Sequence, residues 1–189
     1  ASSGFQVIAT CRKPDEAIAL SQLDNVTVHA MDVSDETQIA ALGAQLQNTP
    51  IDILINNAGI QHVEKIENFP DDKWDAIIAI NMSSAFHTSA AAVEGMRAKG
   101  WGRIINIASA HGLTASPYKA AYVAAKHGVV GMTKVIALET AQEPITANAI
   151  CPGYVLTPLV EAQIPDTMKE YDMSREDVIK NVMLTRQPS

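Results

Sequence analysis

The order of apolar segments constrains this chain more than any other feature. Short apolar runs typical of β-strands alternate with longer amphipathic segments of helical length. This alternation is typical of βαβ units, in which a helix connects two parallel strands. The runs with strand character are residues 5–10, 26–31, 51–55, 103–108 and 145–150. We therefore predict an α/β fold with a parallel sheet that helices cover.

The segments between these runs predict the helices. Helical length and apolar spacing indicate helices over residues 70–80, 83–99 and 117–140. Gly100 is expected to end the second of these, and Ser34 to cap a further helix that carries Ile39, Leu42 and Leu46 on one side. The sequence pattern after Pro158 no longer fits the sheet, and residues 158–189 are predicted to form a lid over a site. Because no repeat or linker appears, residues 1–189 are expected to form a single domain.

Charge and cysteine content narrow the class of function. The 189 residues include 14 Lys and Arg against 21 Asp and Glu, a net charge of −7. This acidic balance predicts no nucleic-acid partner, and no uninterrupted apolar stretch approaches the ~20 residues of a membrane span. Cys11 and Cys151 lie far apart and match no metal-ligand spacing. We therefore expect no metal and no disulfide, in a reducing, cytoplasmic compartment.

Tyr122 and Lys126 form the strongest candidate for chemistry. Residues four apart share one face of a helix, so the phenol and the ammonium project together. A cation within a few ångströms lowers the pKa of a tyrosine, which makes it a usable general acid or base. The same spacing is common in ordinary amphipathic helices, so the interpretation needs support from other residues.

That support comes from small and polar residues that follow the predicted strands. Ser109 directly follows a strand, at the edge where open α/β sheets bind ligands, and its hydroxyl is suited to hydrogen-bond a carbonyl oxygen. Residues 56–59 (NNAG), and Pro152 with Gly153, leave room beside two other strand ends. Asn81 lies in a helical segment that asparagine does not favour, which predicts a break or a polar role. Each of these is also consistent with an ordinary turn or cap.

Taken in this order, the motifs resemble the short-chain dehydrogenase/reductase family across nearly the whole chain. The resemblance implies a Rossmann-like, doubly wound parallel sheet in three α/β/α layers and an NAD(P)-dependent oxidoreductase of the EC 1.1.1 class. It implies that Tyr122 is the general acid/base and that Ser109 holds the substrate carbonyl. Lys126 would lower the pKa of Tyr122 and bind the nicotinamide ribose, and Asn81 would position a water in a proton relay. A homotetramer is also implied by the resemblance.

The same resemblance implies which residues contact the cofactor. Asp32 and Val33 would contact the adenine, and Thr157 the nicotinamide amide. Besides Tyr122 and Lys126, the other cofactor-binding residues that it implies are Arg12, Asn57, Ala58, Gly59, Pro152, Gly153 and Val155. NAD is the expected cofactor, although Arg12 and Lys13 follow the first predicted strand, where arginine accommodates the 2′-phosphate of NADP.

Within this family the sequence is most similar to the D-3-hydroxybutyrate dehydrogenases. The positions that match the substrate-carboxylate site of that subfamily are Gln61, His111, Lys119 and Gln163. A small anionic keto acid needs a cation and several donors, and Lys119 is predicted to lie one helical turn before Tyr122. Tyr154 stands where that subfamily has tryptophan, next to the substrate. The resemblance thus implies interconversion of D-3-hydroxybutyrate and acetoacetate by hydride transfer.

Both ends of the chain depart from the family pattern. The first predicted strand matches the family's second strand, so we expect a partial domain that lacks the first strand, the glycine-rich TGxxxGxG loop and the last strand. This would separate residues 5–10 and 26–31 from residues 51–55 and expose apolar strand edges. Two alternatives stay open: an NADPH-dependent ketoreductase for an uncharged carbonyl, and an inactive truncated chain without the pyrophosphate loop.

Overall fold

The strands follow the order that the sequence predicts. The computed structural model describes residues 4–155 and 157–185, so residues 186–189 of the predicted lid lie outside the described part. All strand pairs are parallel. One sheet has two strands, β1 (Val7–Cys11) and β2 (Val26–Ala30). The other has three strands, in the order β3 (Ile53–Asn56), β4 (Gly102–Ile107) and β5 (Ile145–Ile150). The predicted parallel α/β architecture is confirmed.

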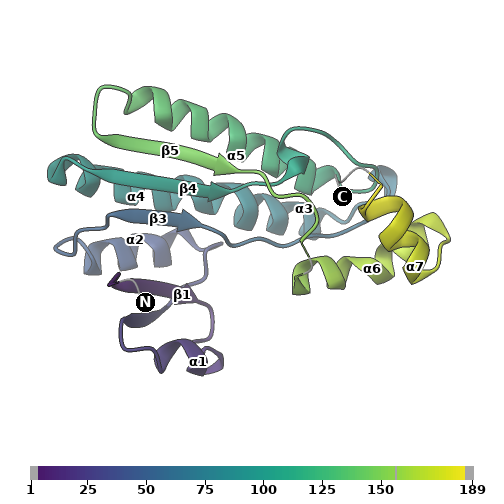
Figure 1. Cartoon of the computed structure of the whole chain (residues 1–189), viewed down its shortest axis with the longest axis horizontal. Helices are drawn as coiled ribbons and strands as arrows, with labels where there is room; N and C mark the ends of the chain where they lie inside the picture. The colour runs from purple at the N-terminus through teal and green to yellow at the C-terminus, as the bar shows by residue number, and fades with distance from the viewer. Residues whose placement is uncertain (1–3, 156, 186–189) are drawn as a thin grey trace.

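The two sheets are separate, as predicted. Among the described residues, neither β1 nor β2 pairs with β3, and Figure 1 shows the β1–β2 pair set apart from the larger sheet. Val7 in β1 is 37% exposed, and Ile53 and Ile55 in β3 are 37% and 59% exposed. Both sheets therefore present apolar side chains to solvent.

Helices connect the strands and cover one face of the larger sheet. The α-helices are α1 (Ile18–Ser21), α2 (Glu36–Gln45), α3 (Asp71–Ile78), α4 (Ser84–Lys99), α5 (Ala120–Glu139), α6 (Pro158–Tyr171) and α7 (Arg175–Asp177). A π-helical segment, η3 (Ala79–Ser83), continues α3 into α4, and a second one, η5 (Val178–Met183), follows α7. The continuous helical run from α3 to α4 lies beside α5. Both pack along β3, β4 and β5 (Figure 1).

The start of α2 corrects one prediction. Asp35, and not Ser34, is the N-cap, because its carboxylate accepts hydrogen bonds from the backbone N–H groups of Thr37 and Gln38. The Ser34 side chain instead donates to the carboxylate of Asp32 at 2.6 Å. Where two capping side chains are adjacent, only the one with the correct backbone geometry can cap the helix.

The start of α5 corrects a second prediction. The helix begins at Ala120 and not at residue 117, because Tyr118 adopts a left-handed backbone conformation with φ 66°. A helix of L-residues does not continue through such a residue. Lys119 is consequently the N-cap of α5, at the junction of loop and helix.

Separate clusters of buried side chains hold the elements together. Met96 of α4 packs on Ile104 of β4 and Ile145 of β5, and this cluster fixes α4 to the three-stranded sheet. Ile164 of α6 packs on Val178 of η5, which joins the C-terminal helices into one unit. That unit lies beyond the carboxyl ends of β4 and β5 (Figure 1).

The helical run Asp71–Lys99 is long and apolar enough to cross a membrane by length and composition alone. Core helices of α/β proteins pass the same test. Here the run packs along β3 and β4, and its Ser84 and Thr88 hydroxyls donate to carbonyls of the preceding helical turn.

Candidate active site

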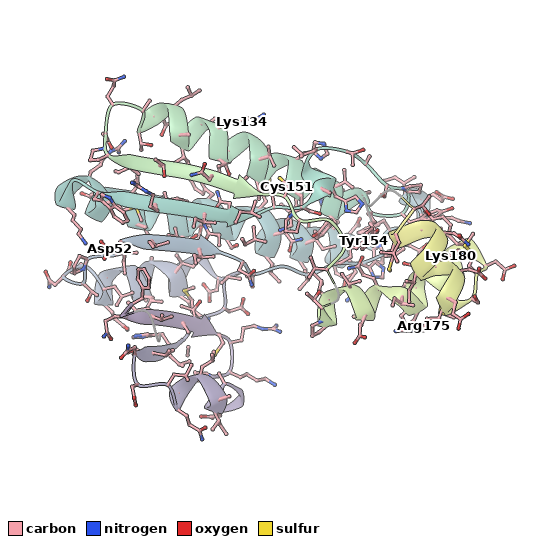
Figure 2. The ribbon with its side chains drawn as sticks, viewed as in Figure 1. Asp52, Lys134, Cys151, Tyr154, Arg175 and Lys180 are labelled. Atoms are coloured by element: carbon pink, nitrogen blue, oxygen red, sulfur yellow. The ribbon has the colours of Figure 1, made fainter. Side chains whose placement is uncertain are left out.

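A cavity of about 70 Å³ lies where β4 and β5 end and α6 begins. The predicted site residues that line it are Ser109, His111, Lys119, Tyr122, Pro152, Gly153, Tyr154 and Gln163. Ala110, Leu159 and Val160 also line it, and no local pattern predicts them, because the contact of α6 with the strand ends arises only in the folded chain. Figure 2 shows Tyr154 between the carboxyl end of the sheet and the C-terminal helices.

Ser109 and Tyr122 meet in this cavity. Ser109 lies two residues after the end of β4, and its Oγ accepts a hydrogen bond from the backbone N–H of His111 at 3.1 Å. Tyr122 lies in the first turn of α5. Burial raises the pKa of Tyr122, and a hydrogen bond with Ser109 lowers it in part, so the pKa remains above its ordinary value. The phenol is therefore protonated at neutral pH.

Lys126 lies on the same face of α5 as Tyr122, with Nζ 5.6 Å from the centre of the phenol ring. Its Nζ donates to the carbonyl oxygen of Ile107 at 2.7 Å. Burial lowers the pKa of Lys126 to about 8, and the interaction with Cys151 raises it in part. The lowering of the Tyr122 pKa by Lys126 stays a prediction, since burial of the phenol and its hydrogen bond with Ser109 are what shift this pKa in the structure.

Asn81 confirms the predicted break in its helix. It lies in the π-helical segment η3, and such bulges occur frequently at functional sites. Its Oδ1 accepts from the N–H of Ile60 at 2.8 Å, and its Nδ2 donates to the carbonyl of Ile60 at 2.9 Å. A Cβ on Gly59 would lie 3.7 Å from Asn81 Oδ1 and 3.9 Å from Lys126 Nζ. The turn after β3 thus lies against Asn81 and Lys126.

Lys119 places a buried positive charge in the cavity. The residue is 6% exposed, and its Nζ donates to the Tyr154 hydroxyl at 2.9 Å and to Gln163 Oε1 at 3.1 Å. Burial lowers the pKa of Lys119 to about 8, so the ammonium form still predominates at pH 7. Both of these partners are neutral, and a buried charge is stable only with adequate compensation. The cavity therefore favours a ligand with negative charge.

His111 lies beside this charge and is neutral. Burial lowers its pKa to about 4, with further contributions from the charges of Lys119 and His127. One ring nitrogen, Nε2, lies 2.7 Å from Ser116 Oγ, and the other, Nδ1, lies 3.5 Å from Ser109 Oγ. Ser116 was not expected from the sequence, because a loop serine five residues away carries no periodic signal.

Gln61 is placed outside the lining of the cavity. Its side-chain amide is buried, and neither Nε2 nor Oε1 has a hydrogen-bond partner. Buried amides are almost always paired, so this group is suited to a polar ligand or a water.

The residues expected to contact adenine lie at the two-stranded sheet. Hydrogen bonds from Ser34, and then the charge of Arg12, hold the pKa of Asp32 below its ordinary value. Val33 packs on the buried cluster that includes Met31. The structure thus brings Arg12 close to Asp32, at positions far along the chain from Ser109 and Tyr122.

The chain also offers groups that suit a nicotinamide cofactor. Asn57 and Ala58 are exposed at the end of β3, and Gly153 and Val155 are exposed after β5. Thr157 caps α6, with its Oγ1 accepting from the N–H of Val160 at 3.3 Å. Together with the Lys126 ammonium, these small or polar groups fit a ribose and a carboxamide at the sheet edge.

Known proteins are similar to this chain in sequence and in fold. A D-beta-hydroxybutyrate dehydrogenase of Rhizobium meliloti (strain 1021) is 55% identical over 177 residues, which cover 93% of this chain and 68% of the relative. A D-beta-hydroxybutyrate dehydrogenase of Cupriavidus necator is 55% identical over 87% of this chain and 64% of its own length. The chain thus spans about two thirds of the length of these relatives.

A solved structure agrees with the Rossmann-like fold. A variant of actinorhodin polyketide ketoreductase with NADPH superposes with a TM-score of 0.88 and 30% identity, covering 96% of this chain and 73% of that structure. The family model described as "short chain dehydrogenase" matches residues 1–167. The chain therefore belongs to the short-chain dehydrogenase family, whose members are nicotinamide-dependent oxidoreductases.

Proposed function

We propose that this protein interconverts D-3-hydroxybutyrate and acetoacetate with a nicotinamide cofactor. The observation that carries the proposal is the buried ammonium of Lys119 in the same cavity as Ser109 and Tyr122. Lys119 suits a carboxylate, whereas the two hydroxyl groups suit a carbonyl or alcohol oxygen. A substrate with both groups in one short molecule meets both requirements, and the names of the relatives point to the same substrate.

The size of the cavity supports a small substrate. One water needs roughly 10–15 Å³, so a cavity of about 70 Å³ accommodates roughly five to seven water-sized groups. A four-carbon hydroxy acid suits this space.

Each residue of the site has its own role in the proposed reaction. The bound nicotinamide supplies the hydride acceptor for alcohol oxidation and the hydride donor for ketone reduction. Tyr122, which its raised pKa keeps protonated, donates its proton to the ketone oxygen of acetoacetate as that oxygen gains charge. In the oxidation direction the phenol first gives up its proton, and the resulting phenolate takes the alcohol proton. Ser109 donates a hydrogen bond to the same oxygen. Lys126 and Asn81 pass the Tyr122 proton to or from solvent through a water.

We propose NAD as the cofactor, with NADP as the second candidate. The similarity of the substrate half to hydroxybutyrate dehydrogenases supports NAD. Arg12 favours NADP, because it is exposed directly after β1, near Asp32, where arginine accommodates a 2′-phosphate. The ratio of kcat/KM for the two cofactors decides: a ratio above one for NAD over NADP supports the first, and the inverse supports the second.

We also propose that residues 158–185 form a lid within a single domain, and that copies of the cytoplasmic protein assemble as a tetramer through α4 and α5. Phe86 on α4 and Leu138 on α5 are exposed apolar residues on those helices. A molar mass from light scattering that corresponds to one chain would contradict the tetramer.

Substrate charge provides the test of the proposed function. The intact protein is assayed with acetoacetate and with its methyl ester, which keeps the ketone and removes the negative charge. A kcat/KM at least about thirtyfold higher for acetoacetate is the expected result, since a buried hydrogen-bonded charge pair contributes roughly 2–5 kcal/mol. Equal or faster turnover of the ester would favour a ketoreductase for uncharged carbonyls.

A further inference from the structure

The contact between His111 and Ser116 has no part in the chemistry proposed above. We propose that Ser116 is a positioning residue: it donates its hydroxyl proton to Nε2 of His111 and so holds the ring as the Nδ1–H tautomer, with that proton directed at Ser109. The inference rests on the proposed role of Ser109, and it identifies what fixes the hydrogen bonding of that serine.

The geometry of the pair is that of a strong hydrogen bond. Nε2 and Ser116 Oγ are 2.7 Å apart, and both residues are partly buried. Ser116 is not among the residues that line the cavity, whereas His111 is. Ser116 therefore acts on the site only through the imidazole that it contacts.

The charge state of His111 makes its tautomer decisive. The ring is neutral at neutral pH, because burial and the charges of Lys119 and His127 disfavour protonation. A neutral imidazole carries one proton, so one nitrogen donates and the other accepts. When Ser116 donates to Nε2, the ring proton must lie on Nδ1, the nitrogen that is 3.5 Å from Ser109 Oγ.

This tautomer determines which way the Ser109 hydroxyl points. Ser109 Oγ already accepts a hydrogen bond from the backbone N–H of His111 at 3.1 Å. With a second donor at Nδ1, the oxygen receives two hydrogen bonds, and its own proton is directed to Tyr122 or to the substrate oxygen. In the opposite tautomer Nδ1 would accept the Ser109 proton and withdraw it from the reacting oxygen.

Nitrogen-15 NMR of ring-labelled histidine tests the tautomer without turnover. His111 signals are identified by their loss in His111→Asn. In the native protein we expect the chemical shifts of a protonated Nδ1 and an unprotonated Nε2, and in Ser116→Ala a mixture or reversal of the two. A protonated Nε2 in the native protein, or no change in Ser116→Ala, would overturn the proposal.

Kinetics of the same variants tests the consequence. Ser116→Ala should lower kcat for D-3-hydroxybutyrate roughly tenfold, the effect of one lost hydrogen bond, with a smaller change in KM because Ser109 acts on the reacting oxygen. Ser116→Thr, which retains the hydroxyl, should restore both kcat and the native NMR pattern. Thr114→Ala is the matched control, since it removes an exposed hydroxyl from the same loop, and it should change neither.

The outcomes separate this inference from the proposed function. A Ser116→Ala enzyme with native kcat, or with a reduced kcat but an unchanged His111 tautomer, would overturn the positioning role. Activity retained by Tyr122→Phe would instead overturn the proposed function, and it would leave the NMR result on His111 intact.

Discussion

Lys119→Met removes the buried charge of the cavity and keeps most of the side-chain volume. A carboxylate about 4 Å from the ammonium would gain about 4 kcal/mol at an effective dielectric constant of 20. A hydrogen bond to a charged group contributes about 1.5–3 kcal/mol by mutational measurement. We therefore expect a loss of about 2–4 kcal/mol in transition-state stabilisation, which lowers kcat/KM for D-3-hydroxybutyrate roughly 30- to 1,000-fold.

The same substitution should not destabilise the empty protein. The pKa of Lys119 is about 8 in the fold, against an ordinary 10.5, so the unfolded chain binds more protons between these values. The free energy of unfolding therefore rises with pH from about 8 to 10.5, and burial of the ammonium is unfavourable below that window. At pH 7 Lys119→Met should have an unchanged or higher Tm. Its free energy of unfolding should lack the increase with alkaline pH that Lys119 contributes.

The assay is steady-state kinetics beside thermal unfolding, with Lys134→Met as the matched control. Lys134 is exposed on α5, and Figure 2 shows it on the outer side of that helix. The control should change neither kcat/KM nor Tm by a measurable amount. If Lys119→Met kept kcat/KM within threefold of the native value at native Tm, the buried ammonium would not be the carboxylate site.

Three further predictions concern single residues. Gly112→Ala should destabilise the fold by about 1–3 kcal/mol in chemical denaturation, because its Cβ would lie 2.8 Å from the carbonyl oxygen of Lys126 and 2.9 Å from Val130 Cγ2. Tyr154→Phe should raise KM for the hydroxy acid a few-fold with little change in kcat, since it removes one acceptor from the Lys119 ammonium. The pKa of His111, about 4 against an ordinary 6.5, makes the free energy of unfolding fall as pH drops from 6.5 to 4, and His111→Gln should flatten that dependence in urea titrations.

The sequence predicts the backbone of this molecule well where a local signal is strong. Apolar runs mark the strands, and Gly100, with φ 72°, ends α4 as expected. The spacing of Tyr122 and Lys126 correctly places both on one face of α5. Asn81, a poor helix former, marks the π-helical segment. Each of these outcomes depends on a preference that acts within a few residues.

Other features of the site depend on tertiary contacts and had no local signal. The left-handed conformation of Tyr118, which moves Lys119 out of the helix, is disfavoured for an aromatic residue and so is not predictable from its type. The pKa of Tyr122 is raised by the depth at which the folded chain buries the phenol, and no spacing in the sequence indicates that depth. The partnership of His111 with Ser116 requires the loop to bring the two side chains together.

Tyr122→Phe tests the central claim most directly. The measurement is kcat for hydride transfer between D-3-hydroxybutyrate and the nicotinamide in the intact protein, beside circular dichroism and cofactor binding. Loss of a general acid/base typically lowers the rate by about 10²–10⁴-fold, and we expect a fall of this size with the fold and cofactor affinity unchanged. A variant that keeps more than about a tenth of the native kcat would contradict the account.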